Sequence, residues 1–206
     1  MAYGTAPRRG RIPWLRPDDL DARQRSLYDQ IVSSRGGGAR STPLTDAHGR
    51  LEGPFNAMLL RPDLGKLLQE LGAAIRYSGA LTDRARELSI LEVARIRKSS
   101  YEWFAHEAPG RAAGLTEAEL TALRSGETAP GLSRAETLIL ETVRSLVESR
   151  DLSDDLFNQL EQEVEPEVFF EILTLVGYYD FLAMSLKALR VPLPDGPESP
   201  EGSPGA

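Results

Sequence analysis

Apolar residues recur three and four positions apart along most of the chain, which predicts a series of helices. The predicted helices begin near residues 18, 62, 82, 99, 116, 133, 153 and 166. Thr82, Thr116 and Ser133 are typical N-cap residues, and glutamate follows the last two after three residues, as in a capping box. No run of alternating β-branched residues rises above this helical pattern, so the predicted fold class is all-α.

The segment 168–189 is the most apolar of the chain, and its apolar residues fall nearly all round the predicted helix. Such a helix lies at the centre of a core or is covered by another subunit on a second side. Gly177 would permit another helix to approach closely. In the helix that begins near residue 99, Pro109 removes a backbone donor and is expected to kink or shorten that helix.

The composition changes at both ends and in one internal loop. Residues 1–16 read as an extended N-terminal arm, residues 17–190 as a single helical domain, and residues 191–206 as a disordered tail rich in Pro, Gly, Ser and Glu. Residues 36–53 read as a loop that contains His48. We interpret His48 as an exposed loop histidine, with a lid residue that meets substrate as the alternative.

Charge and cysteine content restrict the function. The 206 residues carry a formal net charge of −7, which argues against a nucleic-acid partner and is compatible with a small-molecule substrate. The chain has no cysteine, which excludes disulfides, thiolate zinc sites and thiol-based redox chemistry. We expect neither a signal peptide nor a membrane-spanning segment. The expected location is therefore the cytoplasm, with no membrane partner.

Glu87, Glu102 and His106 are the candidate catalytic residues. Glu102 and His106 are four residues apart, so they share one face of a helix. Glu87 lies on the preceding helix and reaches the same point if the two helices pack antiparallel. A histidine with carboxylates in hydrogen-bond reach is suited to proton transfer near neutral pH.

Other residues of the same stretch are candidates for substrate binding. Tyr101 and Trp103 would form a pocket wall, although each is as readily explained as core. Arg95 or Arg76 would hold a substrate carboxylate, a hypothesis that rests on charge alone.

Two plainer interpretations remain open. Glu102 and His106 could form an ordinary surface pair, while Glu87 pairs with Arg84, Arg86 or Arg95 on a solvated face. Glu87, Glu102 and His106 could instead bind a metal. The Glu-x-x-x-His spacing differs from the Glu-x-x-His of di-iron bundles, however, and a second half-site is missing, so no metal is predicted.

An ordered set of short motifs resembles the carboxymuconolactone decarboxylase family, which includes the alkylhydroperoxidase-like proteins. The central motifs are Arg86-Glu87-Leu88, Val93-Ala94-Arg95, Tyr101-Glu102-Trp103, His106 and Ala113-Gly114-Leu115. Weaker ones extend the resemblance over roughly residues 11–194, namely Ile12-Pro13, Gln24-Arg25, Tyr28-Asp29, Gly53-Pro54-Phe55-Asn56, Gly177-Tyr178-Tyr179 and Val191-Pro192-Leu193-Pro194.

The resemblance implies both a fold and a site. The implied fold is an alkylhydroperoxidase-like helical bundle with a central helical hairpin, assembled as a homo-oligomer, a trimer or hexamer. In the thiol-peroxidase branch a glutamate, two cysteines and a histidine form the site. Those positions correspond here to Glu87, Ser99, Glu102 and His106. Both thiols are absent, so a cysteine-free proton relay is what remains.

We therefore expect a cofactor-independent enzyme that resembles carboxymuconolactone decarboxylase. It would act as a lyase, or as an isomerase or cyclase of related chemistry, on a small carboxylated or carbonyl compound. The alternative is a non-catalytic helical oligomer that binds a ligand or partner and has lost the thiol chemistry.

Overall fold

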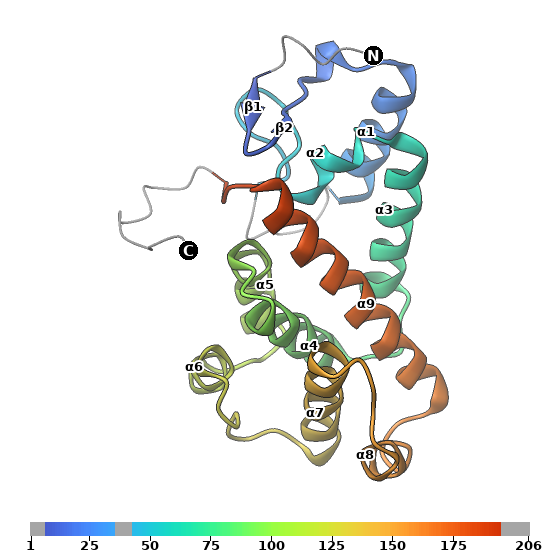
Figure 1. The fold of residues 1–206 in the computed structure, drawn as a ribbon, viewed down its shortest axis with the longest axis vertical. Helices are drawn as coiled ribbons and strands as arrows, with labels where there is room; N and C mark the ends of the chain where they lie inside the picture. The colour runs from blue at the N-terminus through green and yellow to red at the C-terminus, as the bar shows by residue number, and fades with distance from the viewer. Residues whose placement is uncertain (1–6, 36–42, 195–206) are drawn as a thin grey trace.

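Helices dominate the computed structural model, which describes residues 7–35 and 43–194 (Figure 1). The helices are α1 (Ala22–Arg35), α2 (Pro54–Met58), α3 (Pro62–Tyr77), α4 (Asp83–Ile96), α5 (Ser100–Ala112), α6 (Glu117–Ser125), α7 (Arg134–Glu148), α8 (Asp154–Leu160) and α9 (Pro166–Leu189). A short 3-10 helix covers Pro17–Asp19, and strands β1 (Arg8–Arg9) and β2 (Ile12–Pro13) form a small antiparallel ribbon. The predicted all-α class is confirmed.

Helix α4 lies at the centre of the bundle, between α5, α7 and α9 (Figure 1). A short turn joins it to α5, and Lys98 in that turn has a positive φ of 52°, which reverses the chain. Every residue from Glu87 to Ala94 is buried, so α4 presents side chains to neighbours on all sides. The helical hairpin of α4 and α5 is thus the predicted central element.

Two clusters of apolar side chains pack against α4. The larger one joins α4 to α1, α3, α7 and α9, and includes the fully buried Ile90 and Leu175. The smaller one joins α4 to α6 and α7 through Leu88 and Leu91, which are also fully buried. Burying a leucine or isoleucine side chain contributes about 1.5–3 kcal/mol. Helix α4 is therefore held from opposite sides.

The predicted capping boxes are present, and one arginine connects them. Thr116 with Glu119 begins α6, and Ser133 with Glu136 begins α7. Arg84, in the first turn of α4, forms an ion pair with Glu119 and another with Glu136, whose Oε1 lies 2.7 Å from the Arg84 Nε. Local capping and tertiary contact therefore involve the same carboxylates.

Helix α5 passes through Pro109 and ends three residues later at Ala112, so the proline does not itself end the helix. Helical backbone hydrogen bonds continue after the proline, because the Ala113 N–H donates to the Pro109 carbonyl at 2.8 Å. Gly110 lies close to α4, where an added Cβ would be 3.2 Å from Leu91 Cδ1. Close packing of α5 on α4 at this point maintains the helix despite the proline.

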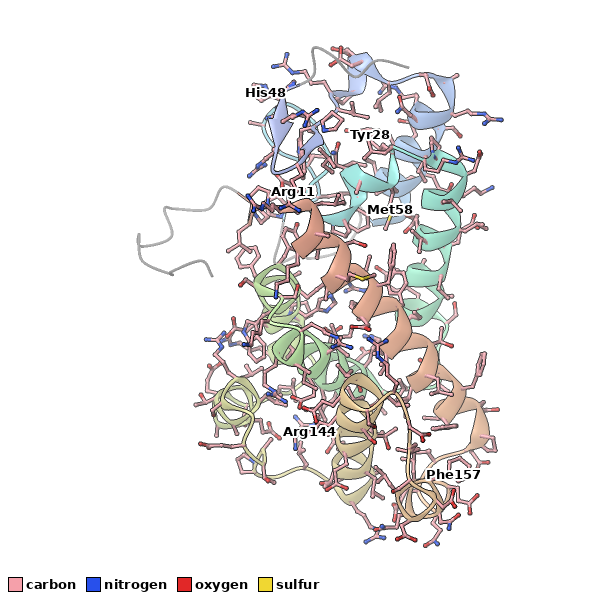
Figure 2. All side chains as sticks on the ribbon, in the orientation of Figure 1. Arg11, Tyr28, His48, Met58, Arg144 and Phe157 are labelled. Carbon is pink, nitrogen blue, oxygen red and sulfur yellow. The ribbon has the colours of Figure 1, made fainter. Side chains whose placement is uncertain are left out.

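The described ends of the chain pack together. The Arg11 N–H donates to the Leu189 carbonyl at 2.8 Å, and the Arg9 Nη2 donates to the Leu193 carbonyl at 3.2 Å. Figure 2 shows Arg11 beside the C-terminal end of α9. Residues 8–13 are therefore a docked ribbon rather than an extended arm, and residues 191–194 are packed rather than tail. The remaining tail prediction, for residues 195–206, lies outside the described residues.

Helix α9 is long and apolar enough, by length and composition, to cross a membrane. This property does not overturn our expectation that no segment spans a membrane. Core helices share these properties, and one side of α9 is indeed buried, through residues such as Ile172, Leu175 and Leu182. Its other side carries exposed apolar residues, and nothing lies within 4 Å of the Cβ position of Gly177. The close helix approach expected at Gly177 does not occur within the described chain.

Candidate active site

Glu87, Glu102 and His106 converge at one buried point between α4 and α5. Glu87 comes from the middle of α4, and Glu102 and His106 come from successive turns of α5. Only 1% of Glu87, 4% of Glu102 and 4% of His106 is exposed. The interpretation of Glu102 and His106 as a solvated surface pair is therefore wrong.

Glu87 fixes the orientation of the His106 ring. The Glu87 Oε2 lies 2.7 Å from the His106 Nδ1. A carboxylate can only accept a hydrogen bond, so Nδ1 carries the proton in this pair. In the neutral ring, Nε2 is then left with its lone pair and is able to accept a proton.

Glu102 lies on the other side of the ring. Its Oε2 is 3.6 Å from the His106 Nε2, a separation longer than a hydrogen bond. The basic nitrogen and the second carboxyl group thus face each other without being joined. A protonated Glu102 can give a proton and the Nε2 lone pair can take one, so a compound that contacts both groups could exchange protons with them.

The two carboxyl groups have opposite pKa shifts. Burial alone would raise the pKa of Glu87, but His106, Arg76 and Arg86 together lower it below its ordinary value. Burial raises the pKa of Glu102, and the opposing effect of His106 and Arg76 does not cancel this. One carboxyl group is therefore kept ionised while the other tends to hold its proton, which separates their roles in proton transfer.

Two further residues belong to this site. The Tyr179 ring, from α9, meets the His106 ring edge-on, with 5.2 Å between centroids and an interplanar angle of 89°. Burial raises the pKa of Tyr179 well above its ordinary value, so its phenol stays neutral. Arg76 lies in the last turn of α3. Burial would lower its pKa, but nearby groups, among them Glu87 and Glu102, raise it above its ordinary value.

Sequence reasoning did not single out Tyr179, and it named Arg76 only as a charge-based option beside Arg95. Both residues reach the site because α3 and α9 pack beside α4 and α5. The spacing of residues along the sequence does not predict this packing. The only signal in the sequence was the position of Tyr179 within a motif of the family resemblance.

The predicted substrate-binding residues lie in three different environments. Tyr101 is buried, and a Cβ on Gly53 would come within 2.5 Å of its hydroxyl oxygen. Trp103 packs on the smaller apolar cluster, and the Arg124 guanidinium lies 4.7 Å from the centroid of its ring. These contacts match the interpretation of both aromatics as core.

Arg95 is engaged in a structural ion pair. Its Nε and Nη2 donate to the two carboxylate oxygens of Glu92, at 3.0 and 2.7 Å. Glu92 is fully buried and also accepts from the Arg144 Nε at 2.6 Å. This pairing disagrees with the predicted role, since the Arg95 guanidinium is already occupied by a protein carboxylate.

The remaining candidates are placed as follows. His48 lies on an exposed turn at the end of the molecule that carries β1 (Figure 2), as in the exposed-loop interpretation. Arg84 pairs with Glu119 and Glu136 rather than with Glu87, whereas Arg86 Nε lies 3.6 Å from Glu87 Oε1.

Within residues 7–35 and 43–194, no group of three or more His, Asp or Glu side chains has a metal-binding arrangement.

Comparison with known proteins supports the family resemblance. Residues 62–143 match the sequence model of the Carboxymuconolactone decarboxylase family. The match runs from the start of α3 into α7, and it includes Arg76, Glu87, Glu102 and His106. No protein of curated function matches the sequence.

Solved structures share the fold at low sequence identity. An alkylhydroperoxidase AhpD core protein from Ralstonia eutropha JMP134, an uncharacterised peroxidase-related protein, is 15% identical, with a TM-score of 0.72 over 92% of this chain and 95% of its own. A protein of unknown function from Agrobacterium tumefaciens is 19% identical, with a TM-score of 0.63 over 70% of this chain and 100% of its own.

A third structure has a bound small molecule. It is a cysteine-to-alanine variant of the debrominase Bmp8 in complex with 2,3,4-tribromopyrrole, 14% identical, with a TM-score of 0.67 over 87% of this chain and 89% of its own. At these identities the likeness concerns the fold alone. The predicted alkylhydroperoxidase-like fold and the resemblance to the family are confirmed, in a chain without cysteine.

Proposed function

We propose that this chain, with its segment from the carboxymuconolactone decarboxylase family, is a cofactor-independent acid–base enzyme. It would act as a lyase, specifically a decarboxylase, or as an isomerase or cyclase, on a small carboxylated or carbonyl compound. The observation that carries the proposal is the buried His106 between two carboxyl groups with opposite pKa shifts. Such an arrangement is typical of paired acid and base roles.

Each residue has a distinct role in this proposal. Glu87 holds Nδ1 and stabilises the imidazolium that forms when Nε2 takes a proton from a carbon next to a carbonyl. Protonated Glu102 returns a proton to the resulting enolate. In a decarboxylation, the carbon–carbon bond breaks, carbon dioxide leaves without the electron pair, and the enolate carbon takes the proton. None of these steps requires a thiol or an added cofactor.

The non-catalytic alternative receives less support. A chain that had lost its chemistry would be expected to leave Glu102 and His106 on the surface or to replace them with apolar residues, because burying ionisable groups is costly. Here three such groups are buried together. The debrominase Bmp8 bound to 2,3,4-tribromopyrrole also illustrates that a protein of this fold can hold a small cyclic compound.

Solvent deuterium exchange tests the function over a range of candidate substrates at once. A panel of carboxylated lactones and oxo acids, incubated in D2O and followed by proton NMR, reports both proton abstraction and decarboxylation. We expect the His106→Gln variant to lose 10²–10⁴-fold in rate on any active compound. Glu107→Gln, which changes a neighbouring residue paired with Arg111 and Arg124, is the control. Undiminished exchange in His106→Gln would exclude the proposed role.

We also propose a homo-oligomer, built through an apolar surface that we call the α3–α9 face. The α3–α9 face consists of exposed apolar residues on two adjoining helices: Leu64, Leu67, Leu71, Phe170, Leu173, Phe181 and Met184. Contiguous exposed apolar residues mark interaction sites. An apolar groove of about 210 Å³ lies between the two helices, lined by residues such as Leu68, Leu186 and Leu189.

A second copy of this chain is the occupant that we propose for the α3–α9 face. The exposed residues of α9 follow one another at spacings of three, eight and three positions, and Gly177 lies in the middle with nothing near its Cβ position. A helix from another copy can therefore cross closely there. The net charge of −7 disfavours an anionic membrane as the partner. A trimer or hexamer, and a cytoplasmic location, remain predictions.

A further inference from the structure

Arg76 is a partly buried cation without a matching protein anion. Its Nε is buried, and within the described residues this atom has no hydrogen-bond partner. Neither a hydrogen bond nor an ion pair of at most 4.0 Å connects its guanidinium to a carboxylate in residues 7–35 and 43–194. Its own neighbour Tyr77 is 65% exposed, and the Arg76 guanidinium carbon lies 6.0 Å from the centroid of that ring.

Other arginines of the helical hairpin differ from Arg76 in having a carboxylate partner, although the buried Nε of Arg86 also has no hydrogen-bond partner among the described residues. Arg95 is bound by Glu92, and Arg97 forms an ion pair with Asp180. Arg86 contacts Asp83, with 2.8 Å between its Nη1 and the Asp83 Oδ1. Buried donors are nearly always satisfied in folded proteins, so an exception beside a cluster of titratable groups calls for a ligand.

The charges around Arg76 indicate the sign of that ligand. The cations are Arg76 and Arg86, and the ionised carboxylate is Glu87, whereas burial favours the neutral forms of Glu102 and Tyr179. Arg86 is paired with Asp83 and lies 3.6 Å from Glu87, so Arg76 is the cation of this group that has no carboxylate partner within 4.0 Å among the described residues. An anion that binds beside Arg76 would pair with its charge and supply hydrogen-bond acceptors for the planar guanidinium group.

We propose that Arg76 is the anion-recognition residue of the Glu87–Glu102–His106 site, and that it binds the carboxylate of a small organic acid. The identification of that acid as a substrate rests on the proposed function, whereas the binding itself does not. The guanidinium would hold the carboxylate, and the adjoining carbon atoms would then lie against His106 and Glu102. Charge alone suggested Arg95 or Arg76 for this role, and the proposal assigns it to Arg76.

The two histidines of the chain make a direct binding test possible. Protein labelled with ¹⁵N and ¹³C at histidine gives separate ring signals for His106 in the site and His48 on the exposed turn. Sodium formate, the smallest carboxylate, is titrated against sodium chloride at constant ionic strength. We expect saturable shifts of the His106 signals and no comparable shift of the His48 signals.

Substitutions of Arg76 then assign the binding. Arg76→Gln is expected to weaken formate binding at least tenfold. Arg76→Lys keeps the positive charge but not the planar guanidinium group that can donate two hydrogen bonds to one carboxylate. We expect it to weaken formate binding less than Arg76→Gln does. Arg124→Gln removes the same charge from the surface of α6 and should leave the midpoint unchanged, and the thermal unfolding of each variant verifies its fold.

Two outcomes would overturn the inference. In the first, the His106 signals of Arg76→Gln shift with the same formate midpoint as in the wild type. In the second, formate shifts the signals of neither histidine in the wild type. Failure of the proposed function is distinguishable from both. Formate binding that depends on Arg76, combined with no deuterium exchange on any compound, would refute the enzyme and leave the anion site. Deuterium exchange by the wild type, combined with an unaltered formate midpoint in Arg76→Gln, would support the enzyme and refute the anion site.

Discussion

The Glu87 Oε2 lies 2.7 Å from the His106 Nδ1, which joins two helices through residues that are 19 positions apart in the chain. Both side chains are buried, so this contact lies inside the central hairpin rather than on its surface. The tautomer of the histidine is therefore set by the packing of α4 on α5. The position of the basic nitrogen follows from tertiary structure.

Replacing Glu87 with glutamine should disturb that tautomer. The amide retains the shape of the side chain but loses the charge, and because it can donate as well as accept, it no longer favours the proton on Nδ1. We expect a lower population of the Nδ1–H form, measured by the ¹⁵N shifts of the His106 ring. Wild-type shifts in Glu87→Gln would contradict the orienting role, and Glu107→Gln serves as the control.

Replacing Glu102 with glutamine should change how stability depends on pH. The pKa of Glu102 in the folded protein is raised above its ordinary value of 4.5, so the folded chain keeps a proton that the unfolded chain releases. The stability associated with protonated Glu102 is full below that ordinary value and is lost as pH rises through the raised pKa. Glutamine cannot ionise, so this loss should be absent in the variant.

Urea unfolding of both proteins at a series of pH values from 4.5 upward measures the effect. We expect the free energy of unfolding of Glu102→Gln, relative to that of the wild type, to grow with pH and then to level off. A difference that stays constant over the whole series would show that the pKa of Glu102 is not raised by folding.

Arg95→Gln should act on stability rather than on the site. It removes one of two cations that neutralise the fully buried Glu92, while Arg144 remains. We expect the free energy of unfolding to fall by roughly 1–3 kcal/mol, the cost of leaving a buried acceptor less satisfied. The formate midpoint and the His106 tautomer should be unchanged. A tenfold loss of formate binding in this variant would restore Arg95 as the anion-binding residue.

Met184→Glu should dissociate the proposed oligomer. Met184 is 62% exposed on the α3–α9 face, so the substitution costs the isolated chain little, within about 0.5 kcal/mol. A carboxylate buried between two copies would be strongly unfavourable. Gln162→Glu adds the same charge at an exposed position outside the face. Sedimentation velocity measures the outcome, and a monomeric wild type or an undissociated Met184→Glu variant would refute the interface.

Local sequence signals predicted the helix starts well. Thr82, Thr116 and Ser133 act as N-caps because their side chains bond the backbone only three residues ahead, a contact that sequence distance alone describes. The pairing of Glu102 with His106 was predictable for the same reason. Glu87 required one further assumption, that consecutive helices pack antiparallel, and the structure agrees with it.

Contacts between distant elements could not be predicted in this way. Arg76 and Tyr179 reach the site only because α3 and α9 pack beside the central hairpin. Arg95 looked free to bind substrate because its partner Glu92 shares a helix with several other charged residues, and nothing in the pattern shows that Glu92 is buried. Pro109 looked disruptive because the packing of Gly110 on α4 is a tertiary compensation.

The ion pairs of Arg84 have a consequence for how the molecule opens. Because this side chain holds the starts of α6 and α7 to the start of α4, the segment between residues 117 and 133 is tethered at both ends. Hydrogen exchange in α6 should therefore follow a shared opening event with the first turns of α4 and α7, rather than independent fraying. We therefore expect an opening at the capping boxes to include the first turn of α4, the helix that carries Glu87.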